Sequence, residues 1–281
     1  MVQVLDLDPE LGSGIAEEQW ETARHACRAK VLRAPRGAWS VPELAGERDD
    51  LIGLVIVEGL VCREVALRDR CMFELLGRGD VLQLPVAAGR PRLGSSITLT
   101  VASETVLVGL GRSFMCAAAR WPSLLAAVHR RLEIQREHLA IQGLITHLPH
   151  AEDRLVLALW HLADRWGCAT PEGTLLPLPL THELLGQLTA SRRPTVSLAV
   201  SALHSAGYVR RSDNGSWLLT PAADEKIEAI AATRKLSRVL GQTIAFRPGT
   251  AQLRHESRAR REQARTAPSR SREVGSNRAM V

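Results

Sequence analysis

The chain has 281 residues, of which 45% are hydrophobic, enough for ordinary buried cores in about two domains. Its longest apolar run, LIGLVIV at 51–57, is much shorter than the roughly 20 residues of a membrane-spanning helix. Its acidic start, MVQVLDLDPELG, lacks the basic and apolar regions of a signal peptide. We therefore exclude membrane and exported proteins, and expect a cytoplasmic protein.

The charge and the cysteines narrow the class further. The net charge of +6 originates near the C-terminus, because residues 233–281 contain 12 Lys and Arg but only 3 Asp and Glu. The five cysteines are scattered and never form a C-x-x-C pair. We therefore assign no zinc or iron–sulfur site and expect buried, reduced thiols.

Residues from about 28 to 115 form short apolar segments separated by glycine and proline, with Gly59 as one of the breaks. Segments of this length at regular spacing, rich in valine and leucine, are typical of a small antiparallel barrel or sandwich. We therefore expect an all-β N-terminal domain. Its predicted strands are 29–34, 51–57, 60–67, 71–76, 81–84, 96–102 and 105–110.

A long helix is predicted from Pro122 to Thr146, because the apolar period changes near Phe114. Apolar residues recur at intervals of four, three, four and seven residues and form a narrow stripe between charged faces. Such a stripe favours pairing with an identical helix; the alternative is that it packs on the chain's own β-domain. We predict a homodimer interface formed by Trp121, Leu125, Val128, Leu132 and Leu139.

A second helix is predicted at about 151–166, since leucines recur along one face and Gly167 is a suitable stop. The segment TPEGTLLPLPL then indicates a linker with a short strand.

Two short helices joined by a tight turn are predicted next. Thr181 caps HELLGQL, and Ser191 is the N-cap candidate of a helix that ends at Gly207. Pro194 falls in the first turn of this second helix, where backbone N–H groups have no intrahelical partner, so it indicates a helix start. This arrangement is typical of a helix-turn-helix.

A β-hairpin is predicted directly afterwards. The segments 208–210 and 216–219 have the character of strands, and Asp213-Asn214-Gly215 between them is typical of a tight hairpin turn. Helix, turn, helix and hairpin within about 40 residues predict a winged helix-turn-helix.

The chemistry of this motif follows from position. The N-terminal turn of the second helix enters the major groove, and a guanidinium fits guanine O6 and N7, so we expect Arg193 to read a base. Arg192 is open to base contact, phosphate contact or exposure to solvent. The other predicted DNA contacts, mainly to phosphate, are Thr181, His182, Ser191, Thr195, Ser197, Arg210 and Arg211.

Residues 185–209, LGQLTASRRPTVSLAVSALHSAGYV, resemble the helix-turn-helix of the Crp/Fnr family of bacterial transcription regulators. LLGRGDVLQLP (75–85) is similar to the family's β-roll segment, and RLVLALWHLADRWG (154–167) to the helix leading into its DNA-binding domain. The resemblance implies an α+β fold. Its parts are an antiparallel, cyclic-nucleotide-binding-like β-roll (15–120), a dimerisation helix (121–148) and a winged helix-turn-helix (149–220). A C-terminal helix with a basic tail (221–281) follows and lies beyond the resemblance.

Departures from the family pattern limit what the resemblance implies. Pro194 and Leu198 stand where the pattern often has Glu and a second Arg, so we do not expect the family's best-known half-site. No Gly-Glu precedes Arg90 and Arg92, which are open to binding an anion or to being solvated. We therefore expect no classical cyclic-nucleotide binding and assign no cofactor; the effector of the β-roll is open.

The C-terminal region contains two further predicted segments. Thr220-Pro221 starts a helix that is expected to extend to about Leu240. The segment after Arg247 is rich in Arg and Ser and low in apolar residues, which predicts disorder. Its charge favours non-specific attraction to phosphate; a solvated tail without a partner is the alternative.

The leading hypothesis is a homodimeric, sequence-specific transcription regulator that binds an inverted repeat in double-stranded DNA, with RNA polymerase as a further candidate partner. The alternative is a ligand-binding signalling module whose winged helix contacts protein. The sequence has no nucleophile–base constellation, phosphate loop or metal-ligand spacing, so we do not expect an enzyme.

Overall fold

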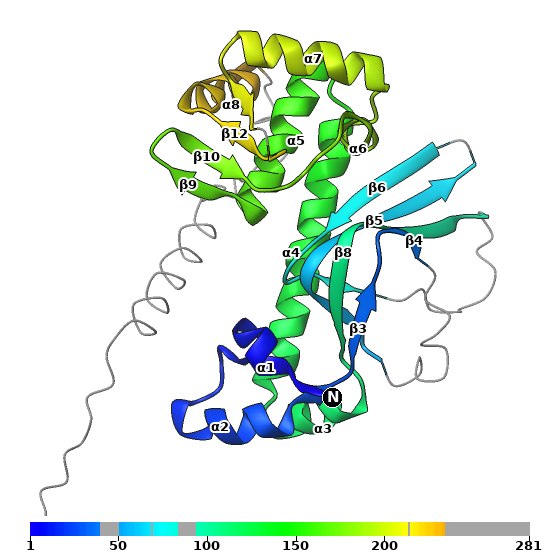
Figure 1. Ribbon diagram of the computed structural model, residues 1–281, viewed down its shortest axis with the longest axis vertical. Helices are drawn as coiled ribbons and strands as arrows, with labels where there is room; N and C mark the ends of the chain where they lie inside the picture. Colours follow the sequence, from blue (N-terminus) through cyan, green and yellow to red (C-terminus); the bar gives the residue numbers. More distant parts are fainter. Residues whose placement is uncertain (40–50, 69, 84–93, 213, 234–281) are drawn as a thin grey trace, which may run out of the picture. The chain divides into compact units, whose positions relative to one another are not determined.

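The computed structural model describes residues 1–39, 51–68, 70–83, 94–212 and 214–233 (Figure 1). They divide into two compact units, residues 1–158 with 180–202, and residues 159–179 with those described from 203 onward. The predicted basic tail, the end of the last predicted helix, and Arg90 and Arg92 lie outside the described residues.

The first unit contains an antiparallel sheet, as the sequence predicts. Its main strands have the order β3-β8-β5-β6, while β4 pairs with β8 and β7 with β5. Their bounds are β3 Val31–Ala34, β4 Gly37–Trp39, β5 Leu54–Leu67, β6 Arg70–Leu76, β7 Val81–Leu82 and β8 Ser96–Gly109. Apolar residues of these strands form a buried core, in which Leu54, Ile56 and Leu107 have no solvent exposure.

Two predicted strand breaks are wrong. Strand β5 continues through Gly59, with register shifts against β8 between Ile56 and Val61. Gly59 has a φ of +95°, and a Cβ atom there would lie 2.4 Å from the Glu104 carbonyl oxygen, so this glycine forms a bulge and not a strand end. Strand β8 likewise runs without interruption where two strands were predicted.

The segment before the sheet is helical, which the sequence analysis missed. Its elements are β1 (Val2–Gln3), α1 (Val4–Leu7), the 3₁₀ helix η1 (Pro9–Gly12) and α2 (Glu17–Ala26), followed by β2 (Arg28–Ala29), which pairs with β1. Val4, Leu5, Leu11 and Ala23 join α3 (Arg112–Arg120) in a second core cluster. Helix α2 buries only Ala23 fully, so its sequence has no apolar stripe to detect.

Helix α4 spans Ser123–Thr146, close to its predicted bounds (Figure 1). Its buried positions include Gln135 and Gln142, which pack against the chain's own sheet domain. The Gln135 side chain accepts a hydrogen bond from the Val81 N–H at 2.8 Å and donates one to the Val81 carbonyl at 3.2 Å. Gln142 donates to the Phe73 carbonyl. These amides explain why Gln135 interrupts the apolar stripe.

The predicted dimer stripe needs a correction. Trp121 and Val128 are 7% and 3% exposed and lie in the second core cluster, and Leu132 packs against it. The Trp121 indole N–H also donates to the Gln19 side chain at 2.9 Å. Trp121 and Val128 therefore stabilise the chain's own domain, which was the alternative interpretation of the stripe, while Leu132 is only half-buried. Leu125 is exposed and Leu139 half-buried, and the homodimer stays a prediction.

The remaining helices are α5 (Ala151–Trp166), α6 (His182–Leu188), α7 (Arg193–Ser205) and α8 (Pro221–Thr233). Strands β9 (Cys168–Thr170), β10 (Gly173–Leu176), β11 (Val209–Arg211) and β12 (Trp217–Leu219) form an antiparallel sheet in the order β11-β12-β10-β9. The predicted linker (170–180) contains one short strand, β10, as predicted, while β9 precedes it and overlaps it only at Thr170. Helix α8 begins at the predicted proline.

The cysteines only partly follow the prediction of buried thiols. Cys27 and Cys62 are buried, Cys168 is half-buried, and Cys71 and Cys116 are exposed. Burial raises the pKa of the Cys27 thiol to about 12 and that of Cys62 to about 11. None of the helices in the described part of the chain combines the length and apolar character that crossing a bilayer requires.

Candidate DNA-binding site

Helix α6 begins with a side-chain cap, as predicted. Thr181 has an extended backbone, and its Oγ1 accepts a hydrogen bond from the Leu184 N–H at 3.1 Å. Glu183 in the first turn interacts favourably with the positive end of the helix dipole. The cap fixes the start of the helix that precedes the turn.

The turn between α6 and α7 is tight because Gly186 allows the backbone to approach. The Ser191 N–H donates to the Gly186 carbonyl at 2.8 Å. A Cβ atom on Gly186 would lie 2.6 Å from the Ser191 carbonyl oxygen, too close for any other residue without a backbone shift. Ala190 completes the reversal with a φ of +48°, in the left-handed region. The predicted helix-turn-helix is thus confirmed.

The predicted cap of α7 is wrong by one residue. Helix α7 begins at Arg193, and the Val196 N–H donates to the Arg192 carbonyl at 3.1 Å, so Arg192 is in the N-cap position. The Ser191 hydroxyl instead donates to the Thr189 carbonyl at 3.2 Å and accepts a hydrogen bond from Arg154 at 3.0 Å. Pro194 is the second residue of the helix, so its interpretation as a start signal is correct.

Arg154, in α5, is a residue of this site that the sequence analysis missed. One end of its guanidinium donates to the carbonyl oxygens of Leu148, at 2.6 Å, and Pro149, at 3.3 Å. The other end donates to the Ser191 hydroxyl. Arg154 therefore joins the segment after α4 to the turn before α7. No local pattern in the sequence indicates this contact, since Arg154 and Ser191 are 37 residues apart.

Two residues predicted to contact DNA form a hydrogen bond with each other. His182 Nδ1 and Ser197 Oγ lie 2.9 Å apart in a hydrogen bond, and both residues are half-buried. This bond connects the first turn of α6 with the first half of α7. Their polar atoms are therefore partly engaged inside the motif.

Helix α7 has a buried side and an exposed outer side. Val196, Ala199 and Leu203 are buried and Val200 is half-buried, so they form the packed side of the helix. Arg192, Arg193 and Thr195 are exposed, so the three predicted contacts at the start of the helix are accessible.

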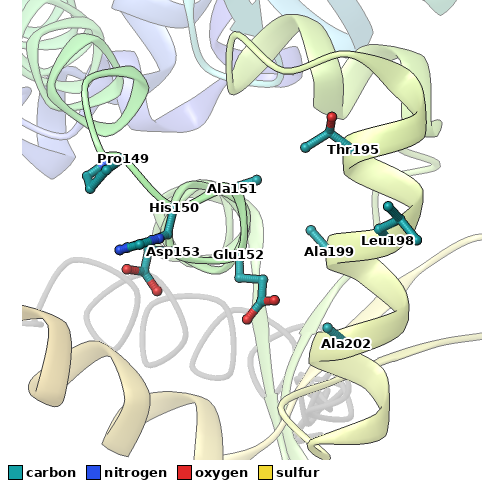
Figure 2. Close-up of a pocket in the computed structure, with 9 residues that line it drawn as sticks. All are labelled: Pro149, His150, Ala151, Glu152, Asp153, Thr195, Leu198, Ala199 and Ala202. Atoms are coloured by element: carbon teal, nitrogen blue, oxygen red, sulfur yellow. The ribbon is translucent and has the colours of Figure 1, made fainter.

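A groove lies between this side of α7 and the start of α5 (Figure 2). Thr195 and Leu198 line it from α7, Glu152 and Asp153 from the first turn of α5, and His150 from the residue before α5. Its α5 wall thus includes two carboxylates, whereas its α7 wall has no charged group.

The hairpin of strands β11 and β12 confirms the predicted wing. Asn214 Oδ1 accepts hydrogen bonds from the Ser216 N–H at 3.0 Å and hydroxyl at 2.6 Å, and Gly215 has a φ of +83°. Asp213 lies outside the described residues. Arg210 and Arg211 are exposed on β11, and the Arg211 guanidinium lies 5.3 Å from the centre of the buried Trp217 ring.

No group of three or more His, Cys, Asp or Glu side chains among the described residues is arranged to hold a metal ion.

Comparison with known proteins gives a clear match in sequence for one part of the chain. Residues 153–223 match the model of the Crp-like helix-turn-helix domain, which spans α5, the turn, α7 and the wing. A search of curated proteins gives no match.

Solved structures match over most of the chain. A mutant of CooA from Carboxydothermus hydrogenoformans is 17% identical with a TM-score of 0.56, covering 82% of this chain and 96% of that one. FixK2 from Bradyrhizobium japonicum is 19% identical with a TM-score of 0.53, covering 72% and 96%. A CRP-family transcriptional regulator from Thermus thermophilus is 22% identical with a TM-score of 0.51, covering 70% and 96%. At these identities the structures establish the fold alone.

Proposed function

We propose that this chain, a DNA-binding transcription regulator with a Crp-like helix-turn-helix domain, binds an inverted-repeat site as a homodimer. The observation that carries the proposal is the α6–α7 turn, which leaves Arg192, Arg193 and Thr195 exposed at the start of α7. An exposed arginine pair at the N-terminus of the second helix matches the electrostatic requirement for entering the major groove.

In this proposal Arg193 reads a base and Arg192 contacts base or phosphate. Thr181, the residue before α6, and the wing residues Arg210 and Arg211 are exposed and contact phosphate. Phosphate contacts fix the position of the protein on the duplex and do not read its sequence. Ser191 has a positioning role, since its hydroxyl already has two partners within the chain.

The homodimer is proposed on a reduced set of α4 residues. Leu125 is 37% exposed, and Leu132 and Leu139 follow it at intervals of seven residues. Heptad spacing places the three leucines on one stripe, and their neighbours His129 and Arg136 on that side are exposed. This stripe is narrower than the one predicted from sequence, because Trp121 and Val128 are excluded from it.

We propose no catalytic activity and no classical cyclic-nucleotide binding. A regulator that contacts promoter DNA makes RNA polymerase a candidate partner, as the sequence analysis anticipated.

Selection from a pool of random duplexes, followed by footprinting on the enriched sequence, tests the proposal. We expect an inverted repeat whose half-sites lie about one helical turn apart, with affinity that falls steeply as salt rises. Uniform protection without an enriched sequence, or affinity for DNA that salt leaves unchanged, would contradict it and favour a winged helix that contacts protein.

A further inference from the structure

Leu198 is the most exposed large hydrophobic side chain of the described residues, at 74%. It lies in α7, five residues after Arg193, and Figure 2 draws it projecting from the helix near Thr195. An aliphatic side chain left in water at the centre of a functional helix lacks the apolar contact that would stabilise it.

The surroundings of Leu198 on α7 are small and uncharged. The exposed residues near it are Pro194, Thr195, Ser201 and Ala202, none of which carries a charge or an amide. Small side chains allow a close approach of the helix to a flat partner. They also leave this part of the helix without a group that can make a bidentate hydrogen bond to a base.

We infer that Leu198 reads a thymine through an apolar contact with its C5-methyl group. The inference rests on the proposed function, since it requires α7 to lie in the major groove. There the methyl group is the apolar feature that marks thymine, and aliphatic side chains are its natural partners. Leu198 is thereby a specificity-determining residue of this chain.

The position of the thymine follows from helix geometry. Five residues separate Leu198 from Arg193, which corresponds to about 7.5 Å along the helix. Base pairs are about 3.4 Å apart, so the thymine lies within roughly two base pairs of the base that Arg193 reads.

The chemistry near Leu198 favours a base edge over a phosphate. Glu152 and Asp153 line the opposite wall of the groove beside Leu198, so an anionic phosphate would be repelled there. The exposed arginines at the start of the same helix provide attraction for the DNA backbone instead. This face of α7 therefore fits DNA whose phosphates are held by the arginines and whose uncharged base edge meets Leu198.

Thymine-to-deoxyuridine substitution tests this inference without altering the protein. Each thymine of the selected half-site is replaced in turn, which removes a single methyl group, and affinity is measured for the wild type, Leu198→Ala and Leu144→Ala. Leu144 is a matched control, an exposed leucine of α4 at 64%.

At one thymine per half-site, we expect the wild type and Leu144→Ala to lose about fourfold in affinity per half-site, as burial of one methyl-sized group implies. The Leu198→Ala variant should bind the thymine and deoxyuridine duplexes equally at that position. A wild type indifferent to every methyl group, or a Leu198→Ala variant that keeps the full sensitivity, would overturn the inference while leaving the proposed function intact. Selection that enriches no sequence would overturn both.

Discussion

Replacing Arg154 by alanine tests whether this side chain holds the turn before α7. The change removes a hydrogen bond of 2.6 Å to the Leu148 carbonyl and one of 3.0 Å to the Ser191 hydroxyl. Hydrogen bonds from a charged donor contribute about 1.5–3 kcal/mol each, and partial exposure of this arginine favours the lower end. We therefore expect Arg154→Ala to lower the free energy of unfolding by about 2–3 kcal/mol.

A double-mutant cycle with Ser191→Ala isolates the contact to the turn. Urea unfolding of the wild type, both single variants and the double variant should give a coupling energy of about 1.5 kcal/mol between Arg154 and Ser191. The exposed Arg130 of α4 provides a control, since Arg130→Ala should change stability by less than about 0.5 kcal/mol. Additive effects of Arg154→Ala and Ser191→Ala would mean that these two side chains do not stabilise each other.

Three further predictions concern the packing of the chain. Gly186→Ala should lower the free energy of unfolding by about 1–2 kcal/mol despite a better helix propensity, because the added Cβ meets a backbone oxygen; equal or higher stability in thermal unfolding would contradict this. Val128→Ala should cost about 2 kcal/mol in the same assay, whereas Leu125→Ala should leave monomer stability nearly unchanged but weaken the dimer in analytical ultracentrifugation. At neutral pH iodoacetamide should modify exposed Cys116 but leave Cys27 intact, since burial raises the pKa of Cys27 to about 12; rapid modification of Cys27 in the folded protein, detected by mass spectrometry, would be inconsistent with its burial.

The helix-turn-helix could be predicted from the sequence because each of its signals is local. Thr181 caps α6 with its own side chain, Pro194 lies in the first turn of α7, and Asn214-Gly215 forms the hairpin turn. Each of these depends on residues within a few positions, so the type of residue determines the local backbone.

Other features depend on contacts between distant parts of the chain, and the sequence analysis missed or misassigned them. Serine commonly caps helices, but the Ser191 hydroxyl accepts a hydrogen bond from Arg154, which is far away in the sequence. Glycine is common in turns, but Gly59 lies inside β5 and forms a bulge in its pairing with β8. Trp121 and Val128 have heptad spacing, yet the N-terminal helices cover them. These helices have no regular spacing of apolar residues, so the local pattern did not indicate that they would cover Trp121 and Val128.

In the proposed function the start of α7 reads DNA sequence. The affinity of the wild type, Arg193→Ala and Arg210→Ala for the selected site and for its single-base variants tests this. We predict that Arg193→Ala loses discrimination at one position per half-site, by about 1–3 kcal/mol, while Arg210→Ala weakens binding to all sequences alike. Unchanged base discrimination in Arg193→Ala would contradict the account.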